Sequence, residues 1–241
     1  YFENSLAAGL ALAKQCQALS SDWTIIATAL LFPTIQQHLL KKEKISLHIH
    51  PEVIHLAYGA KKLDAIDTLH NLENKEYLLS QSDNLRRMLL AIVGDVRVIL
   101  IKLANCLTIL KALKTHEEKE KKLFAEKVMQ LYAPLANRLG LGQLKWELED
   151  NTFRYLNPEQ YFSISKALKL RRIEREQFIH SMQSELEQLL INANIAQHEI
   201  SGRVKHIYSI YKKISRKDVN VTDIYDTSAL RILMPTIDSC Y

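Results

Sequence analysis

Residues 96–103 read Val96-Arg97-Val98-Ile99-Leu100-Ile101-Lys102-Leu103, a run in which nearly every side chain is apolar. Apolar side chains on all sides of a helix predict that the helix is buried. The 241 residues include only six glycines and five prolines, so breaks between elements are few and the elements are long. We therefore predict a mainly α fold with a central, buried helix at this run.

The sequence on both sides of this run predicts further helices, separated by a polar, turn-bearing stretch at residues 45–79. The Glu/Lys alternation of residues 114–127 is typical of a solvated helix face rather than of a binding site. The predicted helical segments are two within residues 6–40, one over 84–113 with a break at Gly94-Asp95, one that ends at Leu139, one from about Leu144, and one from Pro158 to about Asn192.

The pattern changes after Asn194. Residues 196–200 predict a strand that Gly202 ends, residues 203–214 predict a helix, and residues 228–234 predict a second strand. A strand, helix and strand in this order mark the start of a mixed α/β region, with a boundary near residue 190. We divide the chain into a helical domain (1–140), a helical connector (141–195) and the beginning of the α/β domain (196–241).

Composition narrows the class of protein. Hydrophobic residues make up 47% and charged residues 24%, the balance of a folded globular protein. No apolar run approaches the length of a membrane span, and three scattered cysteines without a C-x-x-C pair fit a reducing cytoplasm. Because the chain begins with Tyr1 and ends just after a strand-like segment, we expect it to be a piece of a longer protein.

Positive charge is concentrated in residues 202–217, which hold six Lys or Arg and no acid. On a helix from about residue 203, Lys205, Ser209, Lys213 and Arg216 would share one face. Cations with a hydroxyl near a helix N-terminus suit a polyphosphate. The alternative is a basic face that only meets solvent. The chain has neither a P-loop nor a dinucleotide-binding glycine motif.

An acid follows this basic segment. Asp226 stands just before the apolar strand, and Arg231 comes five positions later. A carboxylate beside a cationic helix is a candidate anchor for Mg²⁺, which proteins commonly hold with one or two carboxylates together with substrate phosphates.

Four blocks carry a family resemblance. They are residues 132–140, residues 145–156, Gly202-Arg203-Val204-Lys205-His206-Ile207-Tyr208-Ser209-Ile210-Tyr211-Lys212-Lys213, and Ile224-Tyr225-Asp226-Thr227-Ser228-Ala229-Leu230-Arg231-Ile232. In this order they resemble the RelA/SpoT family of (p)ppGpp synthetases. The resemblance implies a helical HD-hydrolase-like domain followed by the beginning of an α/β nucleotidyltransferase-like synthetase domain.

The resemblance implies transfer of pyrophosphate from ATP to the 3′ hydroxyl of GTP or GDP in the stringent response. The residues that it assigns to ATP are Arg203, Lys205, Ser209 and Lys213. It assigns Mg²⁺ to Asp226 and support of the phosphates to Arg231. Because the family's guanine-stacking tyrosine and second acidic residue should lie beyond Tyr241, we expect this chain alone to be inactive.

Bifunctional members of the family also carry an N-terminal hydrolase that holds Mn²⁺ through a His-Asp pair, a Glu-Asp pair and a later Asp. The matching positions here are Phe32, Pro33, Gln36, Gln37 and Asn105. None of these side chains offers the imidazole or carboxylate that such a site needs, so we expect no Mn²⁺ there. The resemblance is therefore to the monofunctional, RelA-type members, with a degenerate and regulatory hydrolase-like domain.

Other interpretations stay open at this stage. The chain could instead be a non-catalytic regulatory or interaction module, whereas an active hydrolase would contradict the missing ligands. His48, His50 and His55 lie close together, but no cysteine or carboxylate pattern completes a zinc site. The resemblance also implies a cytoplasmic protein that the ribosome and uncharged tRNA activate through other regions, and it leaves the oligomeric state undetermined.

Overall fold

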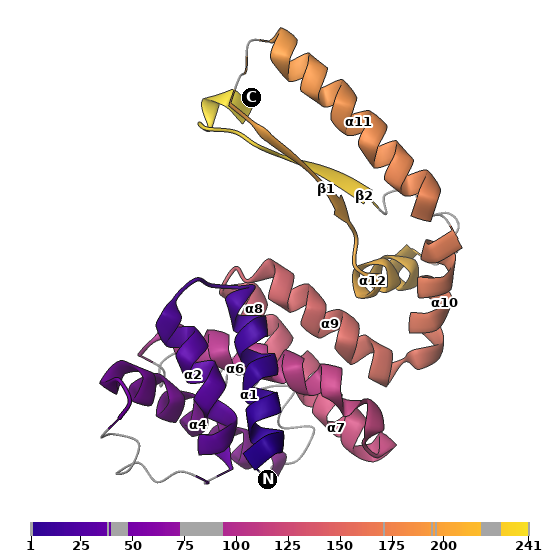
Figure 1. Ribbon diagram of the computed structural model, residues 1–241. Coiled ribbons are helices and arrows are strands. Elements are labelled where there is room, and N and C mark those ends of the chain that lie inside the picture. Colours follow the sequence, from indigo (N-terminus) through magenta and orange to yellow (C-terminus); the bar gives the residue numbers. More distant parts are fainter. Residues whose placement is uncertain are drawn as a thin grey trace. The chain divides into compact units, whose positions relative to one another are not determined.

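The computed structural model describes residues 2–37, 39, 48–72, 94–170, 172–193, 195, 197–217 and 228–240. Helices dominate these residues, which confirms the predicted mainly α fold. The chain divides into two compact units, residues 1–156 and 157–241 (Figure 1). The boundaries predicted at residues 140/141 and 195/196 stay predictions.

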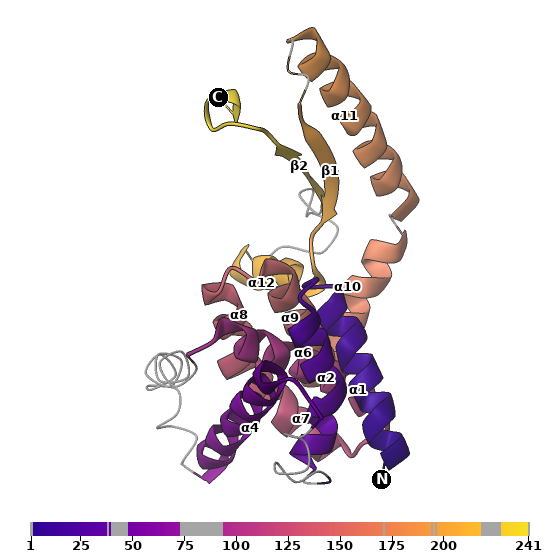
Figure 2. The same cartoon turned by 60° about the vertical axis from the view of Figure 1, so that its left-hand side comes forward.

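The first unit is an all-helical bundle in which α1 lies along α2 and both contact α6 (Figures 1 and 2). Its α-helices are α1 (Phe2–Gln17), α2 (Trp23–Gln36), α4 (Pro51–Leu72), α6 (Val96–Ala112), α7 (Glu118–Lys127), α8 (Ala133–Arg138) and α9 (Gly142–Leu156). Short 3₁₀ and π segments at Leu113–Thr115 and Val128–Tyr132 join α6, α7 and α8 into one path.

Helix α6 is the centre of this unit, as predicted. Ile101, Leu103 and Leu107 are fully buried, and α1, α2, α4 and α9 all pack against the helix. Asp95 begins it, because its carboxylate accepts a hydrogen bond from the backbone N–H of Arg97 at 2.9 Å. At the other end, the Tyr155 hydroxyl of α9 donates to the Leu110 carbonyl at 2.8 Å. The apolar run thus forms the core around which the other helices assemble.

A glycine sets the close approach of α1 and α2. A Cβ built on Gly9 would lie 2.4 Å from the carbonyl oxygen of Leu30, and a backbone atom cannot move aside as a side chain can. Only glycine therefore allows this contact between the two helices.

The π turn at Val128–Tyr132 has a local cause. The N–H of Ala133 donates to the Val128 carbonyl, five residues back, so the helix is wider than usual here. Pro134 follows at once, and its ring would clash with the carbonyl four residues earlier in a regular α-helix. The wide turn lets the chain continue into α8 without a break.

The polar stretch predicted at residues 45–79 is instead mostly helix, since α4 covers Pro51–Leu72. Proline suits the first position of a helix, and Glu52 is favourable in the first turn. The buried positions then follow helical spacing: Val53, Ile54, Leu56, Ala57, Ala60 and Leu63. The polar residues around these positions hid that spacing. Residues 73–93 lie outside the described ones, as does the predicted helix over residues 84–93.

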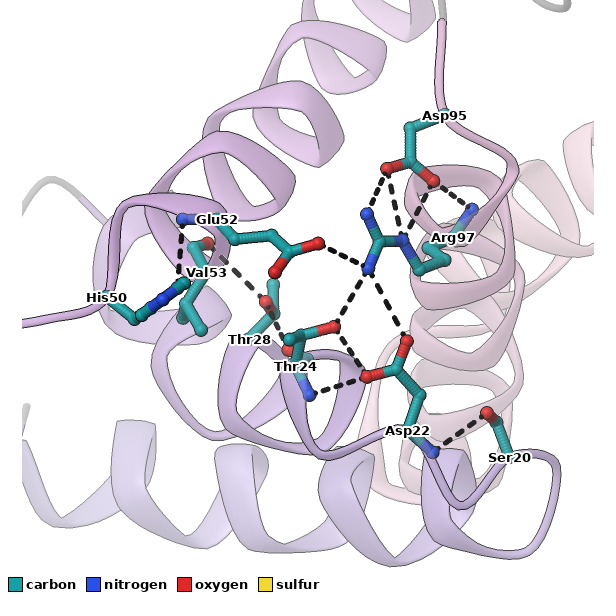
Figure 3. A network of polar contacts seen from close by, with 9 residues as sticks. All are labelled: Ser20, Asp22, Thr24, Thr28, His50, Glu52, Val53, Asp95 and Arg97. Carbon is teal, nitrogen blue, oxygen red and sulfur yellow. Dashed lines mark hydrogen bonds and ion pairs between the residues drawn. The ribbon is translucent and has the colours of Figure 1, made fainter.

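One arginine joins the N-termini of three helices (Figure 3). The Arg97 guanidinium contacts Asp95 at 2.7 Å, Glu52 at 2.7 Å and Asp22 at 3.5 Å. Asp22 caps α2 and Asp95 caps α6, while Glu52 lies in the first turn of α4. Acids are favourable at the positive end of a helix, and Arg97 offsets their mutual repulsion. We call Asp22, Glu52, Asp95 and Arg97 the arginine cluster.

The arginine cluster favours the ionised form of Asp22 and Asp95. Hydrogen bonds from Thr24, and then the contact with Arg97, lower the pKa of Asp22 below its ordinary value. The Arg97 guanidinium is the main cause of the lowered pKa of Asp95. The same contacts, with Asp95 first and then Glu52, raise the pKa of Arg97. These side chains are partly exposed, so solvent weakens each pair.

The second unit combines helices with a small sheet. It contains α10 (Pro158–Leu170), α11 (Arg172–Asn192), β1 (Glu199–Val204), α12 (Ile207–Lys217), β2 (Ser228–Leu233) and a 3₁₀ turn at Asp238–Cys240. β1 and β2 pair antiparallel, with Gly202 opposite Leu230 and Ala229 opposite Arg203. α11 packs along both strands and α10 packs against α12 (Figure 1).

Several boundaries differ from those predicted. The single helix expected over residues 158–192 is two helices, α10 and α11, and Arg171 between them lies outside the described residues. The strand β1 begins at Glu199 rather than residue 196 and runs through Gly202, which does not end it. The helix then begins at Ile207 and not at residue 203. The second strand agrees with its prediction to within one residue.

Gly202 has a packing role within β1. A Cβ at this position would lie 2.6 Å from Cγ2 of Ile179 on α11. The absent side chain lets α11 lie against the strand, which explains why a glycine is found in the middle of a strand rather than at its end.

Within the residues that the structure describes, no helix is both long and apolar enough to cross a bilayer. Cys16 and Cys106 are buried, Cys240 is exposed, and all three are free thiols.

Candidate functional site: a basic pocket between β1, α12 and β2

A pocket lies where β1 ends and α12 begins. It has a volume of about 210 Å³ and is lined by Lys205, His206, Ser209 and Ala229. Lys205 and His206 form the two-residue link between the strand and the helix, Ser209 lies in the first turn of α12, and Ala229 comes from β2. Residues about twenty apart in sequence therefore meet through the pairing of the two strands.

Helix α12 is anchored by its other faces. Ile210 is 1% exposed, and its N–H donates to the His206 carbonyl at 3.1 Å to close the first turn. The rings of Tyr208 and Tyr211 stack at 6.2 Å, and the Lys212 ammonium lies 4.5 Å from the centre of the Tyr208 ring. With these faces packed, Ser209 is held at the pocket.

The structure brings together two of the residues predicted to bind ATP, Lys205 and Ser209. Lys205 precedes α12, so the prediction that it lies on the helix is wrong. The strand continues to Val204 because it pairs with β2, a long-range contact that delays the start of the helix. Lys213 lies one turn beyond Ser209, half-buried, and does not line the pocket.

The structure describes only some of the other residues that were predicted for this site. Arg231 is exposed on β2, two positions after Ala229, so both residues point to the same face of the sheet. Arg203 lies in β1 opposite Ala229, but its side chain is outside the described part of the structure. Asp226, the predicted magnesium ligand, also lies outside the described residues.

The lining suits an anion. An ammonium, an imidazole and a hydroxyl can all donate hydrogen bonds, and no carboxylate is among the lining residues that the structure describes. The volume is below the roughly 300–1,000 Å³ of pockets that enclose a whole drug-sized ligand. The pocket therefore suits part of a ligand, such as the phosphates of a nucleotide, and its described lining does not suit a magnesium ion by itself.

Two lining residues, His206 and Ala229, were not among the predicted site residues. His206 follows Lys205 directly, and this position beside a predicted phosphate ligand was the available signal. Ala229 gave no signal from sequence, because its place in the pocket depends on the register of β1 and β2. Its small side chain leaves the volume open.

The five positions that match the hydrolase ligands lie in the first unit. Phe32 is fully buried in the main core, Pro33 is buried beside it in α2, and Gln36 is half-buried. Gln37 is exposed and its Oε1 accepts a hydrogen bond from the Ser5 hydroxyl at 2.8 Å. Asn105 on α6 is 5% exposed, and its amide nitrogen has no hydrogen-bond partner among the described residues.

Two of these residues have contacts within the helical bundle. Phe32 supplies an apolar ring to the core, and the N–H of Gln37 closes the end of α2. In the described ranges, no group of three or more His, Cys, Asp or Glu side chains is arranged to hold a metal ion. That includes His50, whose ring instead contacts Trp23 edge-on at 5.4 Å.

Comparison with known families gives two matches. The model of the HD domain matches residues 2–142, which is more than half of the chain. The chain belongs to the HD-domain family. A second model, described as a region found in RelA/SpoT proteins, matches residues 202–241. The HD domain thus covers most of the first unit, and the RelA/SpoT region holds all four residues of the pocket.

Curated relatives align with nearly the whole chain. The chain is 41% identical over 237 residues to a GTP pyrophosphokinase of Haemophilus influenzae and 38% identical over 233 residues to a GTP pyrophosphokinase of Escherichia coli. It is 33% identical over 239 residues to a probable guanosine-3′,5′-bis(diphosphate) 3′-pyrophosphohydrolase of Synechocystis. The alignments cover 98%, 97% and 99% of this chain but only 32%, 31% and 31% of those proteins. The chain therefore spans about a third of the length of these relatives.

Proposed function

We propose that this chain belongs to a GTP pyrophosphokinase that makes (p)ppGpp, with its pocket in residues 202–241 binding the phosphates of ATP. The observation that carries the proposal is the joint placement of Lys205 and Ser209 in one pocket. The RelA/SpoT region and the two pyrophosphokinase relatives support it.

The reaction moves the terminal pyrophosphate of ATP to the 3′ oxygen of GTP or GDP. A bond forms between that oxygen and the β-phosphorus, the bond from the β-phosphorus to the α–β bridging oxygen breaks, and AMP leaves; the 3′ hydroxyl loses its proton. Negative charge on the phosphates must be held in place throughout, and positioned cations supply most of such catalysis. We assign Lys205 to charge neutralisation and Ser209 to a hydrogen bond that orients a phosphate oxygen.

Residues beyond the described lining complete the proposed site. We assign Arg203 and Lys213 to further contacts with ATP, Arg231 to support of the phosphates, and Asp226 to Mg²⁺. Arg231 shares the sheet face of Ala229, which supports its assignment. Magnesium would neutralise phosphate charge, and a carboxylate such as Asp226 is the ligand type that it prefers.

We further propose that the HD domain does not hydrolyse (p)ppGpp, as in RelA-type members. One relative is named a probable pyrophosphohydrolase, so family membership alone leaves hydrolysis open. The argument instead rests on Phe32, a ring that is fully buried in the core, and on Asn105, which offers an amide where a carboxylate is needed. A regulatory role for this domain, a cytoplasmic location, and activation by the ribosome and uncharged tRNA follow from the resemblance.

The test is the affinity of the chain for ATP in the presence of Mg²⁺, measured by isothermal titration calorimetry. Replacement of Lys205 by alanine should weaken binding at least about tenfold, because a charge-assisted contact to phosphate is lost. Lys217→Ala is the matched control, since Lys217 is exposed at the far end of α12 and does not line the pocket. Asp226→Ala should weaken the magnesium-dependent part of binding.

The competing function is a non-catalytic regulatory or interaction module. It would be favoured if the chain bound no ATP, or if Lys205→Ala and Asp226→Ala both bound ATP as the unchanged chain does. In the full-length protein, the same Lys205→Ala change should lower the rate of pppGpp formation from ATP and GTP, and Lys217→Ala should not.

A further inference from the structure

Among the described lining residues of the pocket, His206 is a polar residue to which the proposed function assigns no role. It lies between Lys205 and the first residue of α12, and its side chain lines the same pocket as Lys205 and Ser209. The pocket therefore presents three donor groups, and only two of them have an assigned role.

The backbone fixes the position of His206. β1 pairs with β2 up to Val204, and α12 begins at Ile207, so only two residues make the turn. The carbonyl of His206 accepts the N–H of Ile210 at 3.1 Å, which ties the residue to the first turn of the helix. Because regular structure lies on both sides of His206 in the chain, its backbone is fixed and its side chain keeps its direction. A binding residue needs such a fixed direction.

The spacing also favours a shared ligand. His206 and Ser209 are three residues apart at the start of α12, and residues with this spacing lie on the same face of a helix. The first N–H groups of α12 add the positive end of the helix dipole to the same side. Lys205, His206 and Ser209 thus present three different donors toward one small volume of about 210 Å³.

We infer that His206 is a third phosphate-binding residue of this pocket, whose imidazole N–H donates a hydrogen bond to a phosphate oxygen of ATP. The inference rests on the proposed function, since it takes ATP as the ligand. Imidazole carries an N–H donor in both its neutral and its charged form. It therefore binds phosphate without the fixed charge of lysine and orients the oxygen along one direction.

The experiment compares two substitutions at this position in the 241-residue chain. His206→Phe keeps a ring of similar size but removes both nitrogens, and His206→Gln keeps an N–H donor on a flexible chain. Binding of ATP and of AMP, each with Mg²⁺, is measured by calorimetry. His180→Phe on the exposed face of α11 is the matched control, because it makes the same change far along the chain from the pocket residues.

We expect His206→Phe to weaken ATP binding about tenfold, the size of one hydrogen bond to a charged group. The preference for ATP over AMP should shrink by a similar factor, and His206→Gln should recover most of the loss. Far-UV circular dichroism and the melting temperature establish that each variant is folded. If His206→Phe does not fold, it is replaced by His206→Ala, whose side chain also lacks an N–H donor.

Three outcomes would overturn the inference. If His206→Phe binds ATP as the unchanged chain does while Lys205→Ala does not, His206 has no phosphate contact and the proposed function stands. If His206→Phe weakens ATP and AMP equally, the ring packs against another part of the nucleotide. If neither His206→Phe nor Lys205→Ala changes binding, the proposed function fails as well.

Discussion

The two units of the molecule use basic side chains in opposite ways. In the HD domain, Arg97 is surrounded by three carboxylates that helices α2, α4 and α6 present at their N-termini. In the second unit, Lys205 lines a pocket together with His206, Ser209 and Ala229, and none of these described lining residues is acidic. Arg97 is thus surrounded by carboxylates of the protein, and Lys205 lies at a volume that a ligand can enter.

The surroundings of a basic side chain distinguish a structural role from a binding role better than the amino-acid composition does. Both residues lie at the start of a helix, where an anion is favourable. Around Arg97 the protein supplies the anions itself, through Asp22, Glu52 and Asp95. Lys205 instead lies beside His206, Ser209 and Ala229 at a pocket of about 210 Å³, which part of a ligand can enter. We make three predictions about side chains of the two units, in order of decreasing expected effect.

The largest effect is expected at Phe32, which is fully buried in α2. Phe32→Ala should lower the free energy of unfolding by about 3–5 kcal/mol, because it removes a fully buried ring and leaves a cavity. Denaturant unfolding followed by circular dichroism measures the change. Leu6→Ala is the control, since Leu6 is 61% exposed and its loss should cost no more than about 0.5 kcal/mol. A tolerated Phe32→Ala would show that this position is not part of the core.

A smaller effect is expected from a carboxylate at position 105. Asn105→Asp should lower the free energy of unfolding by about 1–3 kcal/mol near neutral pH, because an ionised group is left buried with few partners. Addition of Mn²⁺ should not restore the melting temperature. Asn105→Leu serves as the uncharged control. A melting temperature of the aspartate variant that rises with Mn²⁺ would mean that the HD domain keeps more of a metal site than we propose.

The smallest effect concerns a histidine in the second unit. The His198 imidazole contacts Glu187 at 3.0 Å and the Ile195 carbonyl at 2.8 Å, and its side chain is 5% exposed. Glu187 first, and then the carbonyl, raise the pKa of His198 above its ordinary value of 6.5. The stabilisation is therefore complete below about pH 6.5 and is lost as pH rises through the raised pKa.

His198→Gln should remove this pH dependence, so that melting temperatures between about pH 6 and 9 become flatter than those of the unchanged chain. Glu187→Gln should flatten them in the same way. His180→Gln, on an exposed part of α11, should keep the original slope. A slope that survives both the His198 and the Glu187 change would place the titrating group elsewhere.

Sequence reasoning succeeded where the signal was local. The mostly apolar run at residues 96–103 predicted α6 and its burial, and the apolar segment at residues 228–234 predicted β2. It missed α4, because polar residues interrupt the buried positions of Pro51–Leu72. It placed Lys205 on a helix because the pairing of β1 with β2, which extends the strand to Val204, is invisible in a single segment.

The candidate site shows the same division. Lys205 and Ser209 were found from charge and spacing, and the structure gathers them in one pocket. Ala229 was missed, because its contribution is the space that it leaves and depends on strand register. His206 was missed because a histidine beside a lysine is not a pattern by itself. The hydrogen-bond donors Lys205 and Ser209 could be predicted from the local sequence, whereas the pocket could be found only from the three-dimensional arrangement.

The arginine cluster also bears on the order of folding. Arg97 reaches Asp22 across 75 residues of sequence, and it reaches Thr24 across 73. Contacts that close such long loops cost entropy and form after local helices. The contacts of the Arg97 guanidinium should therefore form late in folding. They should slow the unfolding of a domain that is already assembled. Removal of the guanidinium would show mainly as faster unfolding, with the rate of folding almost unchanged.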